Sequence, residues 1–236
     1  MYAHSRDTLF TFDPVSRIVT RIGLFALANG TAAPYMLDLA VNAVGSIYTA
    51  SDDTLFSVDP MTASVTPIAQ FGLGTERLFA LTFLVPGEYD ASGETLIGAT
   101  NEGAYYRVDP TTAQTTYLGT YPDRWLSSGD IVSIEGLGTF ATVRRTDFPS
   151  DVLVEIRFAA DGSSTTRVIG PIQDGSHAFR QIFGVGYWGR AIYGFSNAGE
   201  LIEIDRATGA GALVETKTGT NQFWGAGVTT VAPVLL

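Results

Sequence analysis

The sequence contains no cysteine, and Lys217 is its single lysine. Without cysteine, neither a disulfide bond nor a thiolate metal site can form. Only 14 basic residues face 24 acidic ones, which gives a net charge of −10. Nucleic acids and anionic membranes are bound through clusters of Lys and Arg, so the charge balance argues against both as partners.

Long apolar runs are also missing. No apolar run approaches 18 residues, so no segment is expected to insert into a membrane. The first ten residues, MYAHSRDTLF, lack the basic and apolar regions of a signal peptide. Hydrophobic residues make up 45% of the chain and charged residues only 16%, which is typical of a well-buried globular protein.

One hairpin pattern recurs along the chain, as LFTFDPVSRIVT, LFSVDPMTASVT, YYRVDPTTAQTT and LIEIDRATGAGA. A divergent copy, LVEIRFAADGSSTT, moves its turn to Asp161-Gly162. The residues that open the aligned turns are Asp13, Asp59, Asp109, Arg157 and Asp205, with spacings of 46 to 50 residues. Repeats of roughly 40 to 50 residues made of short strands indicate the blades of a β-propeller.

Each repeat contains four strand-like runs separated by Gly, Asn and Asp turns, a pattern typical of an antiparallel meander. The C-terminal FWGAGVTTVA reads as a first strand, and the N-terminal MYAHSRDTLF reads as a second and third strand. One blade is therefore expected to be shared by the two ends of the chain, which removes the open edge of the sheet array. The sequence predicts an all-β, five-bladed β-propeller of four-stranded antiparallel blades, in a single domain over residues 1–236.

The repeats resemble the L-Y-x-I-D-P-x-T-G repeats of bacterial extracellular propellers. The stretches SSGDIVSIEGLGTFATV, YWGRAIYGFSNAGELIEI and FWGAGVTT are similar to uncharacterised secreted β-propeller repeat proteins of myxobacteria. The resemblance implies a propeller that is exported, in an extracellular or periplasmic location, and it brings no known activity. Those proteins carry cysteines near the region that matches residues 143–152, where this chain has none.

An acidic pair is the first candidate site. Asp38 in LDLAVN and Asp130 in GDIVSI occupy matching positions near the start of two innermost strands, where the other blades have Ala80, Gly184 and Gly225. One expectation is that each carboxylate accepts backbone N–H groups where the chain enters the strand. Alternatively, the two can hold a Ca²⁺ ion as a cofactor, together with backbone carbonyls, or act as acid and base in glycoside hydrolysis.

The second candidate site is a set of aromatic and amide side chains in loops that share one face of the propeller. It comprises Tyr35, Trp125, Trp224, Asn221 and Gln222. Flat rings and side-chain amides suit the apolar faces and hydroxyl edges of sugars. Trp224 has a competing role as a packing residue, because Phe183 occupies the matching position in the fifth blade.

The third candidate is the longest loop between second and third strands, which contains RRTDFPS. Arg144 and Arg145 are suited to pair with a carboxylate or phosphate of a partner. The alternative is solvated charge with an internal salt bridge to Asp147. The two histidines, His4 and His177, are too few and too far apart in sequence to indicate a metal site.

These features favour a non-catalytic extracellular binding propeller that recognises a glycan or a protein surface through its loop-rich face. One alternative is a polysaccharide hydrolase or lyase that uses Asp38 and Asp130. A second is a structural or adhesive module. Propellers serve all three purposes, so the fold alone does not choose among them.

Overall fold

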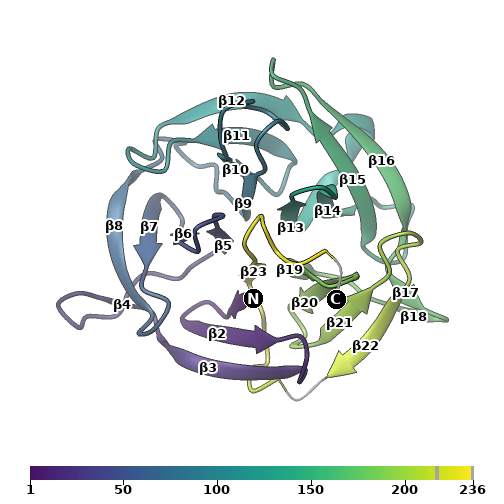
Figure 1. The fold of residues 1–236 in the computed structure, drawn as a ribbon, viewed down its shortest axis with the longest axis horizontal. Helices are drawn as coiled ribbons and strands as arrows, with labels where there is room; N and C mark the ends of the chain where they lie inside the picture. Colours follow the sequence, from purple (N-terminus) through teal and green to yellow (C-terminus); the bar gives the residue numbers. More distant parts are fainter. Residues whose placement is uncertain (216–217, 235–236) are drawn as a thin grey trace.

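Five sheets stand around one axis in the computed structural model, which describes residues 1–215 and 218–234 (Figure 1). Each sheet contains four antiparallel strands, placed in order from the axis to the rim, and one of the sheets gains a fifth strand at its outer edge. The five-bladed propeller predicted from the repeats is confirmed. The divergent fourth repeat also forms a complete blade.

The blades are numbered from the one that contains the N-terminus, and their strands are given from the axis outward. Blade 1 consists of β23 (Gly225–Gly227), β1 (Tyr2–His4), β2 (Thr8–Asp13) and β3 (Ile18–Leu24). Blade 2 consists of β5 (Asp38–Val41), β6 (Ile47–Ala50), β7 (Thr54–Val58) and β8 (Ser64–Gln70). Blade 3 consists of β9 (Ala80–Leu84), β10 (Thr95–Ala99), β11 (Ala104–Val108) and β12 (Thr115–Thr120). Blade 4 consists of β13 (Leu126–Ile134), β14 (Gly138–Arg144), β15 (Val152–Phe158) and β16 (Ser164–Pro171). Blade 5 consists of β19 (Ile182–Trp188), β20 (Ala191–Ser196), β21 (Leu201–Ile204) and β22 (Gly211–Glu215).

Three short features of the connections were not predicted: an added strand, a hairpin and a 3-10 turn. Strand β4 (Ala26–Leu27) adds to the outer edge of blade 2 by parallel pairing with β8. Strands β17 (Gln173–Asp174) and β18 (His177–Ala178) form a small hairpin between blades 4 and 5. A single 3-10 turn, η1 (Pro122–Arg124), precedes blade 4. All three lie in connections between blades, where the repeat pattern carries no information.

The repeated hairpin turns are set by one carboxylate each. Asp13, Asp59, Asp109 and Asp205 accept the backbone N–H of the residue two positions later, at 2.8 to 3.0 Å. Such local acceptance fixes the turn without help from the rest of the fold. In the divergent copy, Asp161 does the same for Ser163.

Burial decreases from the axis to the rim. All residues of the inner strands β5, β9 and β23 are buried, whereas the outer strands β3 and β12 alternate between exposed and half-buried positions. Apolar side chains fill the spaces between neighbouring blades, as in the cluster of Val132, Ile134, Val185 and Tyr187 between blades 4 and 5. The core of the protein is therefore a ring of interblade clusters.

The two ends of the chain close this ring. Strand β23 pairs with β1 through Ala3 and Ala226. Residues after β23 contact blade 4, where Glu135 donates its N–H to the carbonyl of Thr230 at 2.8 Å. The prediction that the N- and C-terminal strands share one blade is confirmed.

Deleting residues 222–236 removes the inner strand of blade 1, so we expect loss of the cooperative unfolding transition and exposure of the edge of β1. Differential scanning calorimetry of the full and shortened chains tests this. A shortened chain that keeps its transition would show that the closure is dispensable.

Candidate functional site

Two buried carboxyl groups link the inner strands at the axis. Asp38 begins β5 and Asp130 lies in β13, and both side chains are fully buried. Oδ2 of Asp38 accepts the N–H of Leu81 in β9 at 2.6 Å, and Oδ2 of Asp130 accepts the N–H of Val185 in β19 at 2.6 Å. Each carboxyl group therefore ties its own blade to the next one.

The same two carboxyl groups lie close enough together to shift each other's ionisation. Two buried carboxyl groups so near each other cannot both be ionised without a large cost, so one of them keeps its proton. Asp130 accepts two backbone N–H groups, from Val185 and from Ile131, each at 2.6 Å, whereas Asp38 accepts one and its Oδ1 has no partner among the described residues. We infer that Asp130 is the carboxylate and that Asp38 is the neutral acid.

The electrostatics agree with this assignment. Burial, and then the charge of Asp130, raises the pKa of Asp38 well above its ordinary value. Burial also raises the pKa of Asp130, but backbone N–H donors oppose that effect. A proton shared by the pair is therefore held more strongly by Asp38.

His4 lies beside this pair and is also fully buried. Its Nδ1 is 2.7 Å from the carbonyl oxygen of Ser5, and since a carbonyl only accepts, Nδ1 carries the proton. Burial lowers the pKa of His4 to about 4, although the Ser5 carbonyl opposes this. A side chain at Gly225 would collide with both the Asp38 carboxyl and the His4 ring, so glycine is required there.

The prediction that Asp38 and Asp130 converge on the axis is confirmed, as is their acceptance of backbone N–H groups. Most of these donors belong to neighbouring blades and not to the start of the aspartate's own strand. The described residues contain no group of three or more His, Cys, Asp or Glu placed to hold a metal ion. A Ca²⁺ ion between Asp38 and Asp130 stays a prediction that lacks a third acidic ligand.

A pocket of about 1140 Å³ lies above the acidic pair, on the face that carries the long loops. Its floor is formed by the residues that immediately precede Asp38 and its four counterparts in the other blades. These residues are Leu37, Phe79, Gly129, Phe183 and Trp224. Phe79, Phe183 and Trp224 are half-buried, so the floor presents partly exposed aromatic rings to the opening.

One wall of the pocket is polar and belongs to blade 4. Oδ2 of Asp151 accepts the hydroxyl of Ser128 at 2.5 Å and the N–H of Ile182 at 2.9 Å. Burial raises the pKa of Asp151 to about 6, against the opposing effects of these two donors and of Arg144 and Arg180. A carboxyl group with a raised pKa beside cations in a pocket is typical of a functional site.

The loop from Arg145 to Ser150 forms the rim over this wall. Arg145 makes two hydrogen bonds with Asp147, at 2.6 and 2.8 Å, and its guanidinium lies 4.1 Å from the centre of the Trp125 ring. The predicted internal salt bridge to Asp147 is confirmed. Trp125 is only 2% exposed, so its ring offers no open face to a ligand in the pocket. Arg145 and Phe148 cover it.

The other candidate residues lie apart from the pocket lining. Tyr35 is 62% exposed, and Arg6 lies between its ring and that of Trp224, at 5.5 and 4.0 Å from the ring centres. Asn221 is exposed and does not line the pocket. Of the five ligand-binding candidates, the structure therefore brings Arg144 and Arg145 into the pocket wall, with Trp125 behind them.

Sequence reasoning did not select Asp151, Arg180, Phe79 or Phe183 as site residues. Phe79 and Phe183 could have been found, because both occupy the position just before an inner strand, as Trp224 does. The sequence signal for Asp151 is weaker. An acidic residue precedes the third strand in four blades, as Asp7, Asp53, Asp151 and Glu200.

Comparison with known proteins shows the fold alone. No protein-family model and no curated protein matches the chain. Among solved structures, a symmetrical protein from work on its de novo evolutionary emergence is 16% identical, with a TM-score of 0.52 over 100% of this chain and 98% of that one. A protein of unknown function from Bacteroides thetaiotaomicron is 13% identical, with a TM-score of 0.54 over 89% of this chain and 55% of that one. U3-55K is 10% identical, with a TM-score of 0.50, and this chain covers 64% of its length.

Within the described residues, no helix combines the length and the apolar character needed to cross a membrane.

The assignment of the shared proton predicts opposite effects of two matched variants. Asp38→Asn keeps an acceptor for Leu81 and replaces a neutral acid by a neutral amide of similar size, so we expect stability close to that of the wild type. Asp130→Asn places an amide N–H₂ against backbone donors and should lower the free energy of unfolding by about 3 kcal/mol. Urea unfolding of both variants measures the difference, and equal losses would refute the assignment.

The same pair predicts a pH dependence of stability. The pKa of Asp38 is raised in the folded chain, so above a pH of about 4 the unfolded chain binds fewer protons than the folded chain does. The contribution of this pair to the free energy of unfolding therefore falls as the pH rises. Asp38→Asn should make the decrease in melting temperature between pH 5 and pH 8 smaller. An unchanged slope would mean that the pair does not hold a proton in the folded state.

Proposed function

We propose that this protein is a non-catalytic, extracellular or periplasmic binding propeller, and that its pocket takes one segment of a glycan. The observation that carries this is the pocket itself, whose floor of three aromatic rings faces a wall of serine, aspartate and arginine side chains. Sugars offer apolar C–H faces to rings and hydroxyl groups to polar side chains, so both surfaces find a partner. The resemblance to exported propeller repeats supports the location.

The size of the pocket favours a glycan over a flat protein surface. Small-ligand sites are concave, with volumes of roughly 300 to 1,000 Å³, and are lined by apolar residues with a few placed polar groups. Standard protein interfaces cover about 800 Å² of each partner. In its concave form, its volume of about 1140 Å³ and its mixed lining, the pocket is closer to a small-ligand site than to a protein interface.

The hydrolase alternative is not favoured by the position of its two carboxyl groups. Asp38 and Asp130 are fully buried beneath the pocket floor and lie close enough together to shift each other's ionisation. Inverting hydrolysis requires the two carboxyl groups to lie about 6.5–9.5 Å apart with a water between them. A purely structural module, for its part, would not account for a pocket with partly exposed rings.

A single site also follows from the differences among the loops. The five loops between second and third strands differ in length and sequence, and the one that contains Arg144 to Asp151 supplies most of the pocket wall, to which the blade 3 loop adds Asn101. We therefore expect one ligand per chain.

A glycan array, followed by analysis of the bound glycans for cleavage products, tests the proposal. We expect binding without cleavage, and a stoichiometry near one by titration calorimetry. Trp224→Ala should weaken binding about tenfold, because a lost ring contact corresponds to about 1.4 kcal/mol.

Trp188→Ala is the matched control, because Trp188 is also half-buried with an unpartnered Nε1 but lies outside the pocket lining. Its binding should equal that of the wild type. Cleavage products would favour the enzyme alternative, and several equivalent sites per chain would move the function away from the pocket.

A further inference from the structure

Two arginines at the pocket wall have guanidinium N–H groups without hydrogen-bond partners among the described residues. Arg144 ends β14, and its Nε donates to the carbonyl of Ser127 at 3.1 Å, which anchors one edge of the group. Its two terminal nitrogens bond to no described residue. Arg180, in the loop before β19, makes no ion pair or hydrogen bond with any described residue. Both side chains line the pocket and are exposed.

The charge of the pocket is opposite to that of the protein. The lining contains three arginines and two aspartates, whereas the chain as a whole has a net charge of −10. Arg145 and Asp147 neutralise each other in a two-pronged ion pair. Arg144 and Arg180 therefore face only Asp151, and the pocket keeps an excess of positive charge that favours an anionic group.

The groups next to the two arginines suit a ligand that also carries hydroxyls. Oδ2 of Asp151 is occupied by Ser128 and Ile182, while Oδ1 accepts no hydrogen bond from a described residue. The hydroxyl of Ser150, which also belongs to the lining, is buried without a partner among the described residues. A buried hydroxyl left without a partner is costly, so a bound ligand that supplies one stabilises the site.

These contacts narrow the ligand class, on the basis of the function proposed above. We propose that the pocket recognises an acidic sugar, a uronic acid residue of a polysaccharide. Arg144 and Arg180 hold its carboxylate, a neighbouring sugar hydroxyl donates to Oδ1 of Asp151, and the ring packs on Phe79 and Phe183. A planar carboxylate suits the paired N–H groups of a guanidinium. A doubly charged phosphate would meet stronger repulsion from Asp151.

The test uses oligosaccharides of galacturonic, glucuronic and mannuronic acid together with their methyl esters, which lack only the charge. We expect at least one acid form to bind and its ester to bind at least tenfold more weakly. Binding of the acid form should also weaken as the salt concentration rises from 50 to 500 mM, because salt screens exposed charges.

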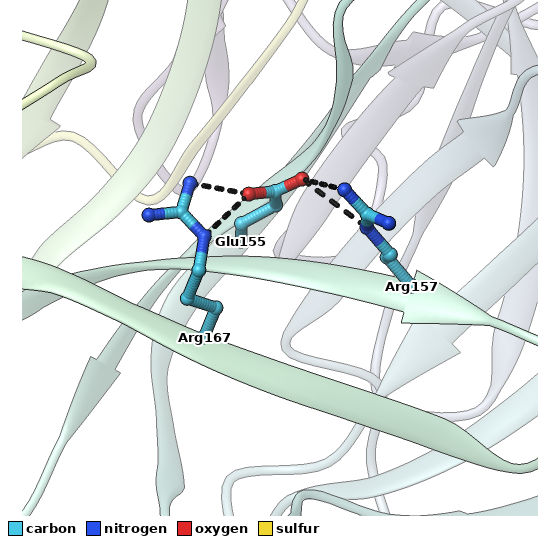
Figure 2. A network of polar contacts seen from close by, with 3 residues as sticks. All are labelled: Glu155, Arg157 and Arg167. Atoms are coloured by element: carbon cyan, nitrogen blue, oxygen red, sulfur yellow. Dashed lines mark hydrogen bonds and ion pairs between the residues drawn. The ribbon is translucent and has the colours of Figure 1, made fainter.

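Variants then assign the contact. Arg144→Gln and Arg180→Gln should each weaken binding of the acid form about tenfold and leave the weak binding of its ester unchanged, because a charged hydrogen bond contributes about 1.5–3 kcal/mol. Arg157→Gln is the control. Figure 2 shows Arg157 and Arg167 on either side of Glu155, in blade 4, and none of the three lines the pocket.

The outcomes separate the two proposals. Equal binding of acid and ester, a preference for sulfated sugars, or full affinity in both arginine variants would overturn the uronic acid assignment and leave a glycan site in place. A preference for inorganic phosphate over every sugar tested would overturn both proposals. Binding of peptides with a free terminal carboxylate, with no sugar bound, would overturn both. Absence of binding to every neutral and acidic glycan tested would overturn the function itself.

Discussion

The arrangement of the inner strands depends on two buried carboxyl groups at the axis. Asp38 and Asp130 belong to blades 2 and 4, and they accept the backbone N–H groups of Leu81 in blade 3 and Val185 in blade 5. Four blades are therefore joined where solvent is excluded, and His4 and Gly225 of blade 1 lie against Asp38. In such a place a satisfied hydrogen bond is strong and an unsatisfied one is costly, so the five inner strands are held in one arrangement.

The position of the pocket follows from this arrangement. The residue before each axial position must lie one step along the strand toward the loop-bearing face, so Leu37, Phe79, Phe183 and Trp224 form the next layer. Gly129 completes that layer, and a side chain there would collide with the backbone of Phe183. Layers of different chemistry thus succeed one another along the axis: buried acids, then aromatic rings, then charged loops.

Much of this architecture could be predicted because it repeats. The Asp turns recur at nearly equal spacing, and each is fixed by local hydrogen bonds, so the number of blades and their closure can be read from the sequence. The meeting of Asp38 and Asp130 could be predicted for the same reason, since matching positions of inner strands must approach one axis. Which of the two keeps the proton depends on backbone donors from other blades, and no local pattern records these.

The loops do not repeat, and the sequence was least informative there. Trp125 appears in a polar loop, YPDRW, but Arg145 and Phe148 come from a different loop and cover its ring. Asp151 occupies a position that is acidic in four blades, yet it alone combines burial, a pKa of about 6 and a place in the pocket. Its environment is made by the long loop before it and by Ile182 of the next blade, contacts that only the folded chain brings together.

The small residues on the inner strands determine how a long ligand can enter. At Gly129, Gly184 and Gly225 the neighbouring chain comes so close that even a methyl group has no room. The axis is filled at this level, and the protein has the form of a cup and not of a tube. On the function proposed above, a polysaccharide therefore presents an end or a side branch to the opening and leaves by the same route.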